Sequence, residues 1–164
     1  MSDGIEVEQI IETKPKKLPM ATSIDKDSIR EVYEDVRSDF TDTEWAVFKF
    51  DGSQIVCTAK GQGFDEFKGQ FTDNERAFGY IRIQMGDEMS KRRKFLFLTW
   101  IGPEVGVIQR AKMSTDKAII KDVLSNFAVE IQAGNDTELD IELFRDALNR
   151  AGGANYGTGV RDLL

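Results

Sequence analysis

Histidine is absent from this chain of 164 residues, and cysteine occurs only once. The missing histidine removes the commonest general base, the usual activator of serine and cysteine nucleophiles, and most transition-metal sites. The single cysteine, Cys57, has no partner within the chain for a disulfide, and we interpret it as a small core residue on a strand. We therefore expect no catalytic residues, no cofactor and no metal site, and we predict that the protein is not an enzyme.

Long apolar runs are also missing. No stretch approaches the roughly 18 residues that a membrane span requires, and the first residues lack the apolar segment of a secretory signal. The glycines at 61 and 63 lack the third glycine of a dinucleotide fingerprint, and no Walker-type Gly-Lys-Ser/Thr occurs. Residues 136–140 lack the glycine of a calcium-binding loop and instead predict the start of a helix. We expect a cytoplasmic protein without a membrane span.

The chain does contain enough apolar residues for a sizeable core, because 40% of it is hydrophobic and eleven residues are phenylalanine. Its centre is the stretch from Ala77 to Ile101. Residues 77–85 alternate between apolar and polar, which predicts a strand, and residues 95–100 are apolar on both faces, which predicts a strand in the middle of a sheet. The loop between them ends in four consecutive cations, Lys91, Arg92, Arg93 and Lys94. The pattern predicts a buried hairpin with an exposed basic tip.

The rest of the chain alternates helices with strands. Ile29, Val32, Tyr33 and Val36 have helical spacing, and Asp51-Gly52 is a turn signal between strands at 45–50 and 55–59, with Cys57 expected on the Ile55/Ala59 face. Phenylalanines at 64, 67 and 71 predict a short helix. A long helix is expected from Gly102-Pro103 to about Leu124, followed by a strand at 127–131 and a last helix. The inward face of the long helix is predicted by one set of apolar residues: Ile108, Ala111, Thr115, Ile119 and Val123. In the last helix the inward residues are predicted to be Leu139, Leu143, Ala147 and Leu148.

These elements predict an α/β (α+β) fold in which helices flank both faces of a mixed five-stranded sheet. We expect a flexible N-terminal extension over residues 1–20, one domain over residues 21–150, and a flexible C-terminal tail over residues 151–164. No internal repeat is evident.

Charge is spread unevenly along the chain. Residues 91–121 carry eight Lys or Arg and two acids, although the whole chain has a formal net charge of −7. A basic strip on an acidic protein favours a specific acidic partner over general polyanion binding. The alternatives are a solvated surface without a partner, a nuclear-localisation signal, or a basic-tip adaptor that binds phosphoinositides or nucleic acid. Nucleic acid is the less favoured partner, because a helix-covered sheet leaves no exposed aromatic face for stacking.

Six segments resemble the coactosin family, the filament-binding branch of the actin-depolymerising-factor homology domains. They are Met20-Ala-Thr-Ser-Ile-Asp-Lys26, Phe50-Asp-Gly-Ser53, Gly86-Asp-Glu-Met-Ser-Lys-Arg-Arg-Lys-Phe95, Thr99-Trp-Ile-Gly102, Gln109-Arg-Ala-Lys112 and Ala151-Gly-Gly-Ala-Asn-Tyr156. The resemblance covers residues 20–156. It implies the homology-domain fold, binding to actin filaments with weak or no binding to monomeric actin, protection of filament ends from capping, and a place in the actin cytoskeleton.

The resemblance also implies which residues bind actin. In coactosins the lysine just before the Phe of the third motif matters most for filament binding, and here this residue is Lys94. Lys91, Arg92 and Arg93 share its basic tip. The start of the long helix also faces actin in these domains, which nominates Arg110 and Lys112. For these two, and for the two tip arginines, a solubilising role is the alternative.

The sequence departs from relatives at both ends. Cofilin-like proteins use a serine at the extreme N-terminus for monomer binding and its control by phosphorylation, and about twenty residues precede the matching region here, so we do not transfer this role to Ser2 or Ser23. Mammalian coactosin-like proteins bind 5-lipoxygenase through a lysine-rich end of the last helix. That end reads Asn149-Arg150 here, which gives 5-lipoxygenase weak support as a partner. We expect a monomer.

Overall fold

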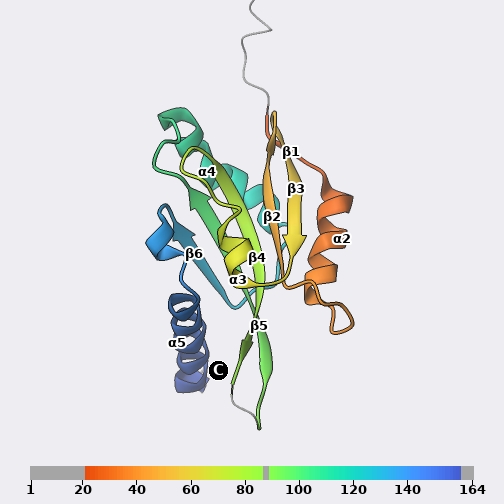
Figure 1. Cartoon of the computed structure of the whole chain (residues 1–164), viewed down its shortest axis with the longest axis vertical. Helices are drawn as coiled ribbons and strands as arrows, with labels where there is room; N and C mark the ends of the chain where they lie inside the picture. The colour runs from red at the N-terminus through yellow and green to blue at the C-terminus, as the bar shows by residue number, and fades with distance from the viewer. Residues whose placement is uncertain (1–20, 87–88, 160–164) are drawn as a thin grey trace, which may run out of the picture.

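A six-stranded mixed sheet forms the centre of the computed structural model, which describes residues 21–86 and 89–159 (Figure 1). The strand order is β1-β3-β2-β4-β5-β6, in which β1 and β6 run parallel to their neighbours and the other pairs are antiparallel. The strands are β1 (Ser23–Ile24), β2 (Trp45–Asp51), β3 (Gln54–Gly61), β4 (Arg76–Met85), β5 (Arg92–Ile101) and β6 (Val129–Ala133). The predicted fold class is confirmed, with one strand more than expected.

Two helices pack on each face of the sheet. One face carries α2 (Lys26–Arg37) and α4 (Val107–Lys121), and the other carries α3 (Phe64–Lys68) and α5 (Ile141–Gly159). A short 3-10 helix, η1 (Asp136–Glu138), lies between β6 and α5. Each face has its own apolar core, so the inward residues of every central strand are divided between two clusters.

The hairpin β4–β5 forms the middle of the sheet, as its sequence predicts. Leu96, Leu98 and Trp100 enter the core beneath α3 and α5, and Phe97 enters the core beneath α2 and α4. Both Phe97 and Trp100 are buried. These aromatics therefore stabilise the fold and do not offer a stacking platform for bases, which removes the main support for a nucleic-acid partner.

Two differences from the sequence-based expectation concern the edge of the sheet. The first is β1, whose two residues pair with β3 and are too few to give a periodic signal. The second is a bulge in β3, where Val47 pairs with Ala59 and Phe48 pairs with Cys57. The extra residue reverses the alternation of faces. Cys57 therefore shares a core with Ile55, while Ala59 joins the opposite core, and the prediction that all three share a face was wrong.

The long helix differs more. It begins at Val107 and not at Gly102-Pro103, because the intervening residues form a loop whose backbone bonds to residues 73 and 75. Its inward face was predicted only in part, because Val123 and Ile119 contact the core as expected while Ile108, Ala111 and Thr115 are exposed. The buried residues of α4 are Met113, Asp116 and Ile120, whereas Ile108 is 78% exposed. The reason is the buried Asp116 near the centre of the helix, because an aspartate in a sequence predicts a surface position.

The last helix also differs in detail. Leu139, Ala147 and Leu148 are buried as predicted, but Phe144 occupies the core in place of Leu143, which is 48% exposed. The helix was expected to end at residues 151–154, yet α5 continues to Gly159. The predicted N-terminal extension lies outside the described residues.

Candidate functional site

The tip of the β4–β5 hairpin projects beyond the rest of the sheet, with α5 beside it (Figure 1). Three of its four cations already belong to strand β5, which begins at Arg92. Lys91, Arg92 and Arg93 are exposed, and Lys94 is half-buried. The cations are therefore held by a strand ladder, in which Gln84 pairs with Arg93 and Ile83 with Lys94.

Successive residues of a strand point to opposite faces, and this alternation sends Arg93 and Lys94 to different neighbours. Lys94 lies on the same side as Leu96 and Leu98, and its Nζ approaches Gly152 of α5 closely enough to contact a side chain placed there. Arg93 lies on the other side, where its Nη1 is 2.9 Å from Asp39 Oδ1 in the loop between α2 and β2. The hairpin stem thus has an α5 side and a loop side.

Among residues 21–86 and 89–152, whose side chains the structure describes, the Lys94 ammonium has no ion-pair or hydrogen-bonding partner. Its strand position and the contact with α5 restrict the side chain, while the half-buried position removes part of its water. A restricted, partly dehydrated ammonium loses less freedom and less hydration when it meets a carboxylate. Among the cations of the tip, Lys94 is the best prepared for a partner.

Arginines also organise the loop side. Arg82 donates hydrogen bonds to the carbonyls of Val36, Ser38 and Thr41 at 3.2, 2.9 and 3.4 Å. The Arg37 guanidinium lies over the Phe95 ring, 4.5 Å from its centroid. A shallow depression on this side is lined by Arg37, Asp39, Gln84, Lys91, Arg93 and Phe95.

Arg110 and Lys112 are not close to the tip. Strand β5 separates them from it, and its ten residues span about 30 Å at roughly 3.3 Å per residue. Arg110 donates to the carbonyl of Gly102 at 3.0 Å and so ties the loop before α4, and Lys112 is half-buried. The six nominated residues therefore form two separate groups.

Sequence reasoning missed two apolar residues in the second group. Val107 and Ile108, at the start of α4, are 83% and 78% exposed. The periodic pattern assigned Ile108 to the core, and recognising Asp116 as a buried residue of the same helix would have corrected it. The start of α4 is therefore an apolar patch beside a cation.

A buried ion pair fixes α4 against the sheet. Arg76 Nη1 is 2.7 Å from Asp116 Oδ2, and the guanidinium also lies over the Phe50 ring, 3.8 Å from its centroid. Thr22 Oγ1 donates to the other carboxylate oxygen of Asp116 at 2.6 Å. The pair thus connects the segment at β1, strand β4 and α4.

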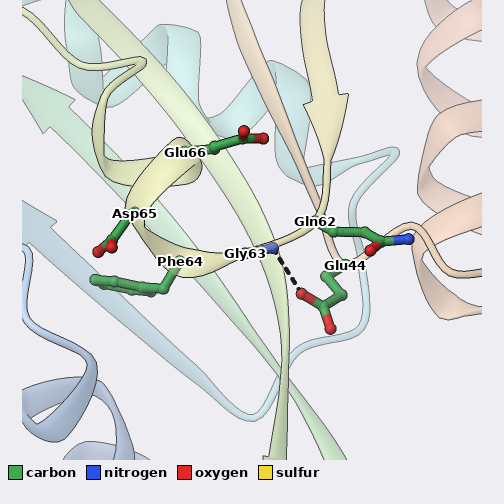
Figure 2. A pocket seen from close by; sticks show the side chains of 6 residues that line it. All are labelled: Glu44, Gln62, Gly63, Phe64, Asp65 and Glu66. Atoms are coloured by element: carbon green, nitrogen blue, oxygen red, sulfur yellow. Dashed lines mark hydrogen bonds between the residues drawn. The ribbon is translucent and has the colours of Figure 1, made fainter.

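A depression at the start of α3 has no basic residue in its lining (Figure 2). Its Glu44 carboxylate accepts a hydrogen bond from the Gly63 N–H at 2.8 Å. Gly63 has a φ of +85°, which favours glycine. The carboxylate therefore supports the start of α3. Within the part of the chain that the structure describes, no group of three or more Asp, Glu or Cys side chains is placed to hold a metal.

The architecture and the basic hairpin agree with an actin-depolymerising-factor homology domain, and comparison with known proteins supports this class. Residues 21–149 match the cofilin/tropomyosin-type actin-binding protein family. A coactosin-like protein of Rattus norvegicus is 45% identical over 137 residues, which cover 84% of this chain and 96% of that protein. Coactosin of Dictyostelium discoideum is 36% identical over 131 residues, which cover 78% of this chain and 90% of that protein.

Solved structures agree. A crystal structure of human coactosin-like protein has a TM-score of 0.77 and 42% identity, and covers 79% of this chain and 99% of that one. A solution structure of mouse coactosin has a TM-score of 0.71 and 44% identity, and covers 85% of this chain and 98% of that one. The chain belongs to the cofilin/tropomyosin-type actin-binding protein family, on its coactosin branch. None of the helices in the described ranges has the length and apolar character to cross a membrane.

Proposed function

We propose that this protein is a non-catalytic actin-filament binder of the cytoplasmic actin cytoskeleton, which contacts filament sides through its basic hairpin tip and the start of α4. In this proposal it binds monomeric actin weakly or not at all, acts as a monomer and counters filament capping. Mouse coactosin, 44% identical to this chain, is an actin filament binding protein. That relative supports the filament, in place of the monomer, as the target.

One observation carries the proposal: Lys94 is half-buried between β5 and α5 and has no charged partner among the described residues. A half-buried cation without an ion pair in the fold remains available to the charge of a partner. A carboxylate of an acidic partner surface would supply the missing charge. The exposed cations at 91–93 would raise the association rate by steering and contribute less to affinity.

The start of α4 would supply a different kind of contact. Val107 and Ile108 expose apolar surface that the fold leaves uncovered, and Lys112 adds a nearby charge. Apolar residues beside a cation suit a hydrophobic contact with a charged rim. Two contact regions about 30 Å apart fit a large partner such as a filament better than a small ligand.

Co-sedimentation at physiological salt tests the proposal. We expect the wild-type protein to pellet with filaments in a saturable way, and to bind monomeric actin weakly or not at all in a parallel assay. A protein that stays in the supernatant at every filament concentration would refute the proposal. Retention on anionic liposomes without retention on filaments would support a phosphoinositide adaptor instead.

A further inference from the structure

We propose that the loop between α2 and β2, residues 38–44, is a third filament contact, on the loop side of the hairpin, with Phe40 as its apolar anchor. The inference rests on the proposed function, because it extends the same interface. It adds Phe40, which lies outside the hairpin tip and outside α4, to the residues proposed to contact the filament. No feature of the sequence pattern singled out this loop.

Phe40 is the most exposed large hydrophobic residue of the described chain, at 97%. It belongs to neither core cluster. A single exposed apolar side chain is common on protein surfaces and needs no explanation by itself. What distinguishes Phe40 is the structure of the loop that carries it.

The loop is held in place on both sides of Phe40. Arg82 binds three carbonyls of the segment 36–41, and Thr41 Oγ1 donates to the carbonyl of Asp35 at 2.6 Å. The Phe40 N–H donates to Ser38 Oγ at 3.0 Å. A fixed backbone presents the ring without the entropy cost of ordering a mobile loop on binding. Aromatic residues on such supports are frequent anchors of protein interfaces.

The loop is continuous with the proposed filament contact. Asp39, next to Phe40, pairs with Arg93 of the basic tip at 2.9 Å. The hairpin stem therefore cannot reach a surface on this side without bringing the loop toward the same surface.

The cations that flank the loop are compatible with the same partner. The depression between loop and hairpin is lined by three cations and one acid, namely Arg37, Lys91, Arg93 and Asp39. Arg37 is held by the Tyr80 hydroxyl at 3.0 Å and by the Phe95 ring. The loop itself carries three acids, Asp39, Asp42 and Glu44, and no Lys or Arg, so complementarity to carboxylates comes from the cations that flank the loop and not from the loop. We therefore assign the loop to the acidic filament surface that the tip contacts, and not to a second copy of this chain.

Filament co-sedimentation of Phe40→Ala tests the assignment. Loss of an aromatic anchor is expected to weaken filament binding about tenfold. The melting temperature is expected to stay unchanged because the ring contributes nothing to either core. Phe40→Tyr, which keeps the ring, is expected to recover most of the affinity. Gln54→Ala is the control, because Gln54 is an exposed residue at the start of β3 and belongs neither to the loop nor to the hairpin.

The outcomes separate this inference from the function on which it rests. If the wild-type protein does not pellet, the proposed function fails and this inference fails with it. If the wild-type protein pellets and Phe40→Ala pellets equally well, only the contact made by the loop is refuted. A wild-type dimer in sedimentation velocity that Phe40→Ala abolishes, with filament binding unchanged, would assign the loop to self-association and would also refute the inference.

Discussion

Two charged residues, Arg76 and Asp116, lie almost fully buried between the central hairpin and α4. Their 2.7 Å ion pair is supported by the Thr22 hydroxyl and by the Phe50 ring. A buried pair adds little net stability compared with well-packed apolar residues, but the removal of one partner leaves the other charge uncompensated. The pair therefore fixes the position of α4, whose start belongs to the proposed actin contact.

At the residue scale we predict that Asp116→Ala lowers the free energy of unfolding by about 3–5 kcal/mol, since it strands the Arg76 guanidinium in the core. Urea denaturation followed by circular dichroism measures this loss. Ser114→Ala, an exposed position of the same helix, is the control and should change stability by less than about 0.5 kcal/mol. If Asp116→Ala is as stable as the control, the loss of Asp116 does not leave a costly unpaired charge in the core, and the prediction is contradicted.

At the scale of elements, the contact between β5 and α5 controls the position of Lys94. Gly152 lies in α5, and a Cβ placed there would be 2.9 Å from Lys94 Nζ. The lysine must therefore move its ammonium if this glycine gains a side chain. The flexible end of a lysine can do so at small cost to the fold.

We predict that Gly152→Ala separates binding from stability. Alanine should stabilise the helix by up to about 1 kcal/mol, while filament binding should weaken because the ammonium is displaced. Thermal unfolding and co-sedimentation measure the two effects. Unchanged filament affinity in this variant would mean that the contact with α5 does not orient Lys94 for binding.

Most elements could be predicted because their signals are local. The hairpin β4–β5 has period-two alternation and a loop of cations, and the turn at Asp51-Gly52 has its own dipeptide signal with Gly52 at a φ of +63°. The helix α2 has four apolar residues with helical spacing, all of which contact its core. Periodicity therefore predicted every strand except β1, and it identified the hairpin β4–β5 as central.

The parts that failed depend on contacts distant in sequence. The bulge that moves Ala59 to the other face is set by pairing between β2 and β3. The face of α4 was predicted only in part, because Asp116 is buried by a partner 40 residues away in the chain. The site showed the same division: the four cations of the tip were evident as a run, whereas Phe40 gains its proposed role only from Arg82 and Arg93, which the fold brings to its loop.

At the scale of the whole molecule, charge and titration set the conditions under which the protein works. The chain has no histidine, so no side chain with an ordinary pKa near neutrality is present. The hydrogen bonds from Lys49 and Thr72 hold the pKa of Glu75 below its usual value of 4.5. The hydrogen bond from Thr43 likewise lowers the pKa of Asp35 from its usual value of 3.8.

We therefore predict a flat pH dependence of the melting temperature between about pH 6 and 8. A lowered carboxyl pKa stabilises the folded state above the unfolded-state pKa, and this stability is lost as the pH falls through the folded-state value. The loss should accordingly begin only below about pH 4.5 and continue as Glu75 and Asp35 take up protons. Scanning calorimetry across pH 3 to 8 measures it. A step in the melting temperature between pH 6 and 8 would contradict the prediction.

The acidic body of the protein also limits how it can approach an acidic filament. The basic tip and the cations at the start of α4 have the complementary sign, so orientation on the filament should follow these two regions. The account then depends on one side chain more than any other. Lys94 is the cation that the fold restricts and partly dehydrates without pairing it.

The filament affinity of Lys94→Ala is therefore the most direct measurement. Co-sedimentation over a range of filament concentrations gives the Kd of the wild-type protein and the Kd of the variant. Thermal unfolding checks that the variant is folded. We predict a Kd about ten to thirty times that of the wild-type protein, with an unchanged melting temperature because the Lys94 ammonium makes no ion pair among the described residues. A folded Lys94→Ala variant that binds filaments as tightly as the wild-type protein would contradict the central claim.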